Sequence, residues 1–329
     1  MKFPIFFIVL VAMGIPARAH DLSGQGYDPH GHPPELPTAA GSSASTGLAR
    51  IFAPFAPAVS THEDGRFLYV SSTGFPDHPI MKGIRNWQQQ IPIPQDYSGQ
   101  NSWRLPLQPV PSSSPAMIRG RFLRGAIALA ANGVPIFNPQ NNRGEIALEI
   151  GELDEWGGHC GRADDYHYHV APLHLQEKVG SGQPVAVALD GYPIYGLTEP
   201  DGTNPKGLDS CHGHETKELG YHYHAAKGYP YVLGGFHGEV TERENQVDPQ
   251  PRAQPFRPAG EPLRGAEITD FKKTGSDSYE LTYRLLGETW HLLYSVQNGK
   301  LWIETRRGNQ TVNSETFERR DRPPRPPKP

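Results

Sequence analysis

Six histidines form two matching sets of three. Residues 166–169 and 221–224 both read Tyr-His-Tyr-His, and each is preceded at the same spacing by one further histidine. Side chains alternate across a strand, so both histidines of each motif should lie on one face and both tyrosines on the other. Three imidazoles with an open coordination position are typical of a catalytic zinc site or a copper site. The sequence therefore predicts bound copper or zinc, with the ligands His159, His167, His169, His214, His222 and His224.

Asp154 and Asp209 occupy the same place in the two sets, five residues before His159 and His214. We expect these carboxylates to orient imidazoles through the ring nitrogen that does not bind metal. We also expect all six histidines to meet in one cleft between the two halves of the domain. The alternative is a polar network without metal, because the aspartates, tyrosine hydroxyls and backbone carbonyls could satisfy buried imidazoles by hydrogen bonds.

The two sets belong to a longer internal repeat. Residues 153–169 align with 208–224 without a gap, and eight of the seventeen positions are identical. Further upstream, residues 127–137 align with 185–195 at a shift of 58 residues. Each unit should contain an apolar strand, a Gly-x-Pro turn, an Asp/Gly/His loop and a Tyr-His-Tyr-His strand. Two copies, about 122–172 and 184–239, predict a pseudo-symmetric pair rather than a solenoid.

The D-x-x-x-G-H loop followed by Tyr-His-Tyr-His, present in both repeats, resembles the motif of the YHYH-domain family of mostly exported proteins. The resemblance covers roughly residues 65–240 and implies membership of the family, but no particular reaction. In one respect the chain differs: the first loop of the family resembles D-x-C-G-G-H, whereas here Trp156 has the Cys position and Cys160 follows His159.

Composition and patterning predict a mainly β, loop-rich fold. The 329 residues include 36 glycines and 34 prolines, and aromatic residues make up 10% of the chain. The pseudo-symmetric YHYH domain should span 51–240, after a disordered arm at 20–50. A linker is predicted at 241–264, a small antiparallel β meander at 265–317 with a hairpin at Asn298-Gly299, and a disordered, basic, Pro-rich tail at 318–329.

Residues 1–19 have the order of a secretory signal peptide. Lys2 precedes an apolar run, and Ala17-Arg18-Ala19 is a typical cleavage site. The run is too short to cross a bilayer, and no other segment approaches eighteen apolar residues. The sequence thus predicts a periplasmic or secreted protein without a transmembrane segment.

The two cysteines, Cys160 and Cys211, would then lie in an oxidising compartment. They occupy non-equivalent positions in the two repeats, as residues that link the repeats could. We therefore predict a disulfide between them, with a pair of thiolate metal ligands as the alternative.

Several classes of function are disfavoured. The net charge of −4 gives no basic face for nucleic acid. The chain has no nucleophile elbow, P-loop, dinucleotide fingerprint, H-E-x-x-H or EF-hand motif. Three functions remain open: an exported domain that stores, senses or uses copper or zinc; a metal-dependent hydrolase or oxidase; and a metal-free surface or interaction module that binds a polysaccharide or protein.

Overall fold

The computed structural model describes residues 47–319. The predicted signal peptide, most of the predicted arm and the tail from residue 320 lie outside this range. Within it, no helix has the length and apolar character needed to cross a bilayer.

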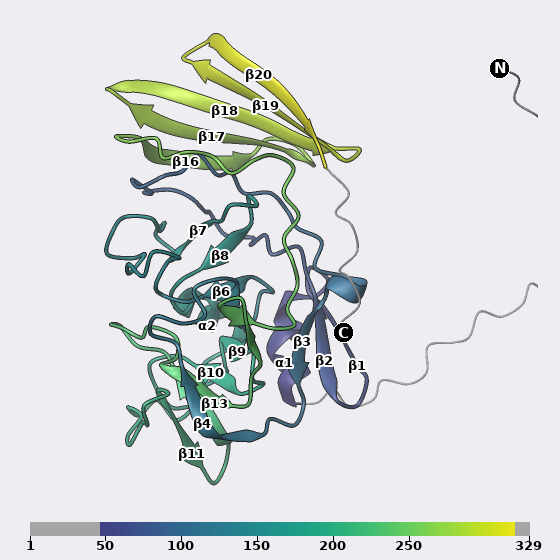
Figure 1. Cartoon of the computed structure of the whole chain (residues 1–329), viewed down its shortest axis with the longest axis vertical. Coiled ribbons are helices and arrows are strands. Elements are labelled where there is room, and N and C mark those ends of the chain that lie inside the picture. The colour runs from purple at the N-terminus through teal and green to yellow at the C-terminus, as the bar shows by residue number, and fades with distance from the viewer. Residues whose placement is uncertain (1–46, 320–329) are drawn as a thin grey trace, which may run out of the picture. The chain divides into compact units, whose positions relative to one another are not determined.

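An eight-stranded sheet carries both repeats. Two antiparallel strands, β5 (Ala126–Ala130) and β9 (Ala186–Ala188), pair at its centre, with Leu129 opposite Val187. From this pair the strand order continues outward in the same way on both sides, as β11-β12-β10-β9-β5-β6-β8-β7 (Figure 1). The remaining strands are β6 (Pro135–Phe137), β7 (Gly158–Cys160), β8 (Tyr166–Tyr168), β10 (Pro193–Tyr195), β11 (Gly213–Thr216) and β12 (Gly220–His224). The predicted pseudo-symmetric, mainly β fold is confirmed.

The register of the central pair defines the pseudo-two-fold axis. Leu129 and Val187 are equivalent in the repeats and face each other, while Ala128 pairs with Ala188 and Ala130 with Ala186. Both strands are entirely apolar and fully buried, as is typical of strands covered on both faces. The repeats therefore meet through their first strands.

The prediction of one shared cleft is wrong. Strands β8 and β12, which carry the Tyr-His-Tyr-His motifs, are separated in the sheet by β6, β5, β9 and β10. Pairing the repeats through β8 and β12 would leave the apolar strands β5 and β9 at the sheet edges, where they would expose their backbone and side chains. The two sets of histidines consequently lie in opposite halves of the sheet.

The predicted disulfide is also wrong, because Cys160 and Cys211 are both free and buried. Cys160 ends β7 at one edge of the sheet, and Cys211 precedes β11 at the other edge. Neighbouring strands are about 4.8 Å apart, whereas a disulfide requires Cα atoms within about 7 Å. The Cys160 thiol instead contacts the thioether of Met81, with 3.5 Å between the sulfurs.

Smaller elements flank the central sheet. A three-stranded antiparallel sheet contains β1 (Ser60–Glu63), β2 (Phe67–Ser71) and β3 (Trp103–Pro106), and β4 (Pro111–Met117) pairs with β13 (Gly235–Gly238). The helical segments are short: α1 (Gly47–Phe52), η1 (Ala53–Phe55), η2 (Gly99–Asn101), η3 (Leu173–Leu175) and α2 (Gln176–Val179). Helix α1 includes residues 47–50, which the sequence assigned to the disordered arm.

The segment predicted as a linker contains a small hairpin of β14 (Glu242–Arg243) and β15 (Gln246–Val247). It also holds Arg257, which forms a salt bridge of 2.8 Å with the buried carboxylate of Asp164. Residues 241–264 are therefore fixed along the YHYH domain by polar contacts.

The predicted meander is confirmed as a five-stranded antiparallel sheet whose strands follow one another in chain order (Figure 1). Its strands are β16 (Glu267–Lys273), β17 (Ser278–Leu285), β18 (Glu288–Gln297), β19 (Lys300–Arg307) and β20 (Gln310–Glu318). The sequence alternation identified the three middle strands. A hydrogen bond of 2.6 Å from the buried Tyr294 hydroxyl to the Pro92 carbonyl connects this sheet to the N-terminal part of the chain.

Candidate metal centres

The first cluster, called site 1 here, consists of His159, His167 and His169. His159 in β7 pairs directly with His167 in β8, and His169 lies two residues further on the same face. The Nε2 atom of His169 lies 3.0 Å from that of His159 and 3.2 Å from that of His167. The antiparallel β7–β8 hairpin thus brings three imidazoles of one repeat together.

Backbone carbonyls fix the tautomer of two of these rings. Nδ1 of His167 lies 3.0 Å from the Asp165 carbonyl oxygen, and Nδ1 of His169 lies 2.5 Å from that of Asn138. A carbonyl oxygen can only accept, so each Nδ1 carries the hydrogen and Nε2 of the neutral ring is a bare acceptor. The contact between these two Nε2 atoms therefore cannot be a hydrogen bond.

Site 1 also keeps its imidazoles neutral. Burial lowers the pKa of His159 and His167 well below the ordinary value, and each is lowered further by neighbouring imidazoles. Burial lowers the pKa of His169 to about 4, although its hydrogen bond to Asn138 and the charge of Glu152 act in the other direction. At neutral pH the site presents nitrogen lone pairs that converge on one point.

The second cluster, site 2, contains His214, His222, His224 and a carboxylate from Glu199. His214 in β11 pairs with His222 in β12, and their Nε2 atoms are 3.1 Å apart. Oε1 of Glu199 lies 2.9 Å from Nε2 of His214 and 3.4 Å from that of His224, while Oε2 lies 3.5 Å from Nε2 of His222. Site 2 therefore offers three nitrogens and one carboxylate.

The imidazoles of site 2 are oriented in the same way as those of site 1. Their Nδ1 atoms lie 2.8, 2.9 and 3.3 Å from carbonyl oxygens, in the order His214 to Lys206, His222 to Gly220 and His224 to Gly196. Gly196 is the counterpart of Asn138 at the shift of 58 residues. The buried Nε2 atom of His224 has no hydrogen-bond partner within residues 47–319.

Both clusters have the dimensions of a metal site. In a tetrahedral zinc site with Zn–N bonds of about 2.0–2.1 Å, ligand nitrogens are about 3.3–3.4 Å apart. The distances between Nε2 atoms here, 3.0–3.2 Å, require a widening of only a few tenths of an ångström. Imidazole and carboxylate donors suit zinc or copper, so both donor sets fit such an ion.

The two aspartates expected to orient imidazoles act elsewhere. Asp154 accepts hydrogen bonds from the Tyr166 hydroxyl at 2.9 Å and from the backbone N–H of Trp156 and Gly158. Asp209 accepts equivalent bonds from the Tyr221 hydroxyl and from the N–H groups of two residues of its own loop, Cys211 and Gly213. These carboxylates fix the loop before each histidine against the tyrosine face, and backbone carbonyls orient the imidazoles.

Glu199 was missed by sequence reasoning, although the repeat could have revealed it. Extended past Tyr195, the 58-residue alignment places Asn141 opposite Glu199, and both residues begin a turn that ends at a glycine, Gly144 or Gly202. Asn141 does not join site 1. Its side-chain oxygen accepts the N–H groups of Arg143 and Glu145, and its amide donates to Glu152 at 3.1 Å. Site 1 thus lacks the fourth donor that site 2 has.

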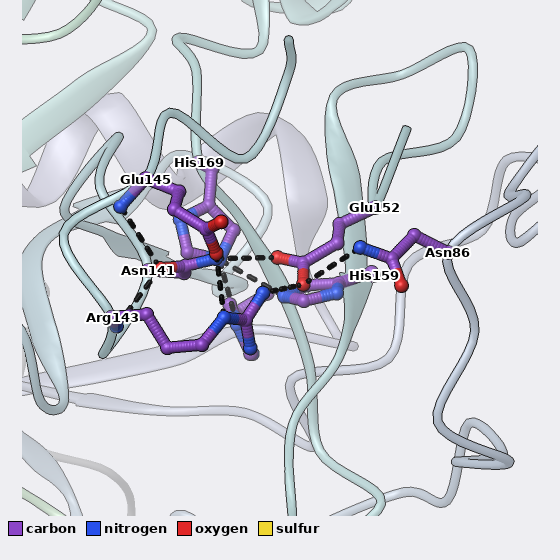
Figure 2. A network of polar contacts seen from close by, with 8 residues as sticks. Asn86, Asn141, Arg143, Glu145, Glu152, His159 and His169 are labelled. Atoms are coloured by element: carbon purple, nitrogen blue, oxygen red, sulfur yellow. Dashed lines mark hydrogen bonds and ion pairs between the residues drawn. The ribbon is translucent and has the colours of Figure 1, made fainter. Parts of the chain in front are cut away.

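A buried ion pair lies beside site 1 instead. Glu152 is 1% exposed and accepts a hydrogen bond of 2.6 Å from Arg143, which also bonds to Glu145. Figure 2 shows this pair beside His159 and His169, and all four residues line one cavity of about 480 Å³. In the second repeat the positions of Arg143 and Glu152 are occupied by Asp201 and Gly207. The pair therefore belongs only to the cluster with three ligands.

Comparison with known proteins agrees with the sequence motifs. A family model described as "YHYH protein" matches residues 102–205, which include site 1 and end before the second Tyr-His-Tyr-His strand. No curated protein and no solved structure matches the chain.

Proposed function

Because residues 102–205 of this chain belong to the YHYH protein family, and each repeat gathers three imidazoles, we propose that it is an exported YHYH-domain protein that binds two copper or zinc ions. One ion is bound at site 1 and the other at site 2. The observation that carries the proposal is the arrangement of the rings: at least two Nδ1 atoms in each site face a carbonyl, and the Nε2 atoms face one another. A cation between these lone pairs removes their mutual repulsion and replaces hydrogen bonds that they cannot make.

The two sites have different roles in this proposal. At site 2 the carboxylate of Glu199 completes four donors, which is the closed set typical of a structural zinc ion. At site 1 the three imidazoles leave a coordination position open, and the cavity of about 480 Å³ adjoins it. Any exchange of ligands therefore takes place at site 1.

The open position also favours a second candidate function, a metal-dependent hydrolase or oxidase with its reaction at site 1. Catalytic zinc sites combine three protein ligands with a water molecule, which the ion activates. Phe137 stacks on His167 with ring centroids 3.8 Å apart, so one side of the site is apolar. This restricts the approach of a substrate to the side of the cavity.

The test is a metal titration of the mature protein, produced without a His tag. Zinc binding by the wild type, His167→Ala and His222→Ala is measured by calorimetry, with the exposed His62, which lies outside both clusters, replaced by Ala as a control. We expect two ions for the wild type and for His62→Ala, and one ion for each of the other variants. The same stoichiometry in all four proteins would contradict the proposal. Absence of binding in the wild type would favour the metal-free network.

A further inference from the structure

The cavity at site 1 is lined by an excess of cationic side chains. Arg124, Arg143 and Arg162 line it together with two carboxylates, Glu152 and Asp165. An ion at site 1 would add two further positive charges if it is zinc. The cavity thus has the charge of an anion-binding site.

Two of these arginines have no internal ion pair. Arg143 is neutralised by Glu145 and Glu152, with distances of 2.5 and 2.6 Å. By contrast, no carboxylate in the described part of the chain lies within 4.0 Å of the guanidinium of Arg124 or Arg162, and both side chains are exposed. Arg124 also lines an adjoining hollow of about 340 Å³, which holds Arg252. These guanidinium groups remain available to a ligand.

The hollow beside site 2 has the opposite charge. It is lined by Glu199, Asp201 and Glu218, with Lys206 as the one lysine among its lining residues. The fourth donor at site 2 is itself a carboxylate from this lining, whereas at site 1 the corresponding coordination position is open. The chain therefore has one metal site that uses its own anionic ligand and one that faces free cations.

We propose that the cavity at site 1 binds a small molecule with an oxyanionic group, a carboxylate or a phosphate. One oxygen of the group takes the open coordination position, and Arg124 and Arg162 hold the remaining negative charge. A volume of about 480 Å³ is that of a pocket for a small molecule rather than for a polymer segment. The inference rests on the proposed binding of metal at site 1, and it names the class of ligand that this site accepts.

The test uses the mature, zinc-loaded protein and three probes: inorganic phosphate, succinate and neutral succinamide. Calorimetry measures the affinity for each probe in the wild type, Arg124→Gln and Arg162→Gln. The control is Arg264→Gln, which removes the same charge from an exposed arginine outside the cavity. We expect phosphate or succinate to bind and succinamide not to bind. Each cavity variant should weaken the bound anion about tenfold, the lower limit for a hydrogen bond to a charged group, and Arg264→Gln should not.

The relative affinities for phosphate and succinate identify the source of the oxyanion. Elemental analysis of the same samples should show two zinc ions in every variant, because none of these arginines is a ligand. If zinc is retained but neither anion binds, or if Arg124→Gln and Arg162→Gln bind it like the wild type, the inference is overturned and the metal proposal stands. If zinc is not retained, both proposals fail.

Discussion

Replacing Glu199 by Gln tests the difference between the two sites. The carboxylate of Glu199 lies within 3.5 Å of all three Nε2 atoms of site 2, and its side chain is 15% exposed. The Gln side chain has the same size, and its amide can donate a hydrogen bond to a bare Nε2 atom, so the metal-free fold should be retained. It cannot supply an anionic oxygen to the ion. We therefore expect a selective loss of metal affinity.

The size of this loss follows from the number of ligands. Structural zinc sites with four ligands contribute about 10–16 kcal/mol of binding free energy, so one ligand accounts for about 3 kcal/mol. This corresponds to a loss of affinity on the order of 100-fold. Site 1 is located in the opposite half of the sheet and should keep its affinity, because distant sites without shared partners behave independently.

A competition titration with a chromophoric zinc chelator separates the two affinities. The matched control is Glu215→Gln, an exposed carboxylate next to His214 in β11 that points to the other face of the strand. We expect the control to bind two ions like the wild type and Glu199→Gln to keep one strong site. Equal affinities in Glu199→Gln and the control would refute the assignment of Glu199 as a ligand.

Three further predictions concern acid stability, the thiols and the centre of the fold. The pKa of His169 falls from about 6.5 in the unfolded chain to about 4 in the fold, so its contribution to stability is present above about pH 6.5 and is lost as the pH falls to about 4. Metal-free wild type should therefore lose up to about 3 kcal/mol more than His169→Gln between pH 7 and pH 4 in urea denaturation, and equal losses would argue against a neutral His169. Thiol titration of denatured, natively exported protein should find both cysteines free, and a reductant should leave the melting temperature unchanged; absence of free thiols would show a disulfide. Leu129→Ala at the fully buried central pair should lower the free energy of unfolding by about 2–5 kcal/mol, and a change below about 1 kcal/mol would indicate that the repeats do not pack through β5 and β9.

Local patterns predicted each half of the site. The spacing of His159 from the Tyr-His-Tyr-His strand and the alternation of side chains were sufficient to predict that His159, His167 and His169 meet. Both depend on one hairpin, in which His159 pairs with His167. The alternation from Tyr279 to Thr305 predicted the meander for the same reason, since each strand pairs with its neighbour in the chain.

The arrangement of the two halves could not be predicted in the same way. A fully apolar strand such as Ala126–Ala130 has no polar face to show which strand it pairs with, so the β5–β9 contact is visible only in the structure. The carbonyl groups that orient the imidazoles also have no sequence signal, because every residue has one. Glu199 was missed because its counterpart is Asn141, which serves its own turn.

The central claim is that this chain binds two transition-metal ions, one in each repeat. The most direct measurement is elemental analysis of the exported protein, purified without a tag and without added metal, together with His167→Ala and His222→Ala. We predict two copper or zinc ions per chain for the wild type and one for each variant. A content near zero in the wild type, with unchanged thermal stability in both variants, would contradict the claim.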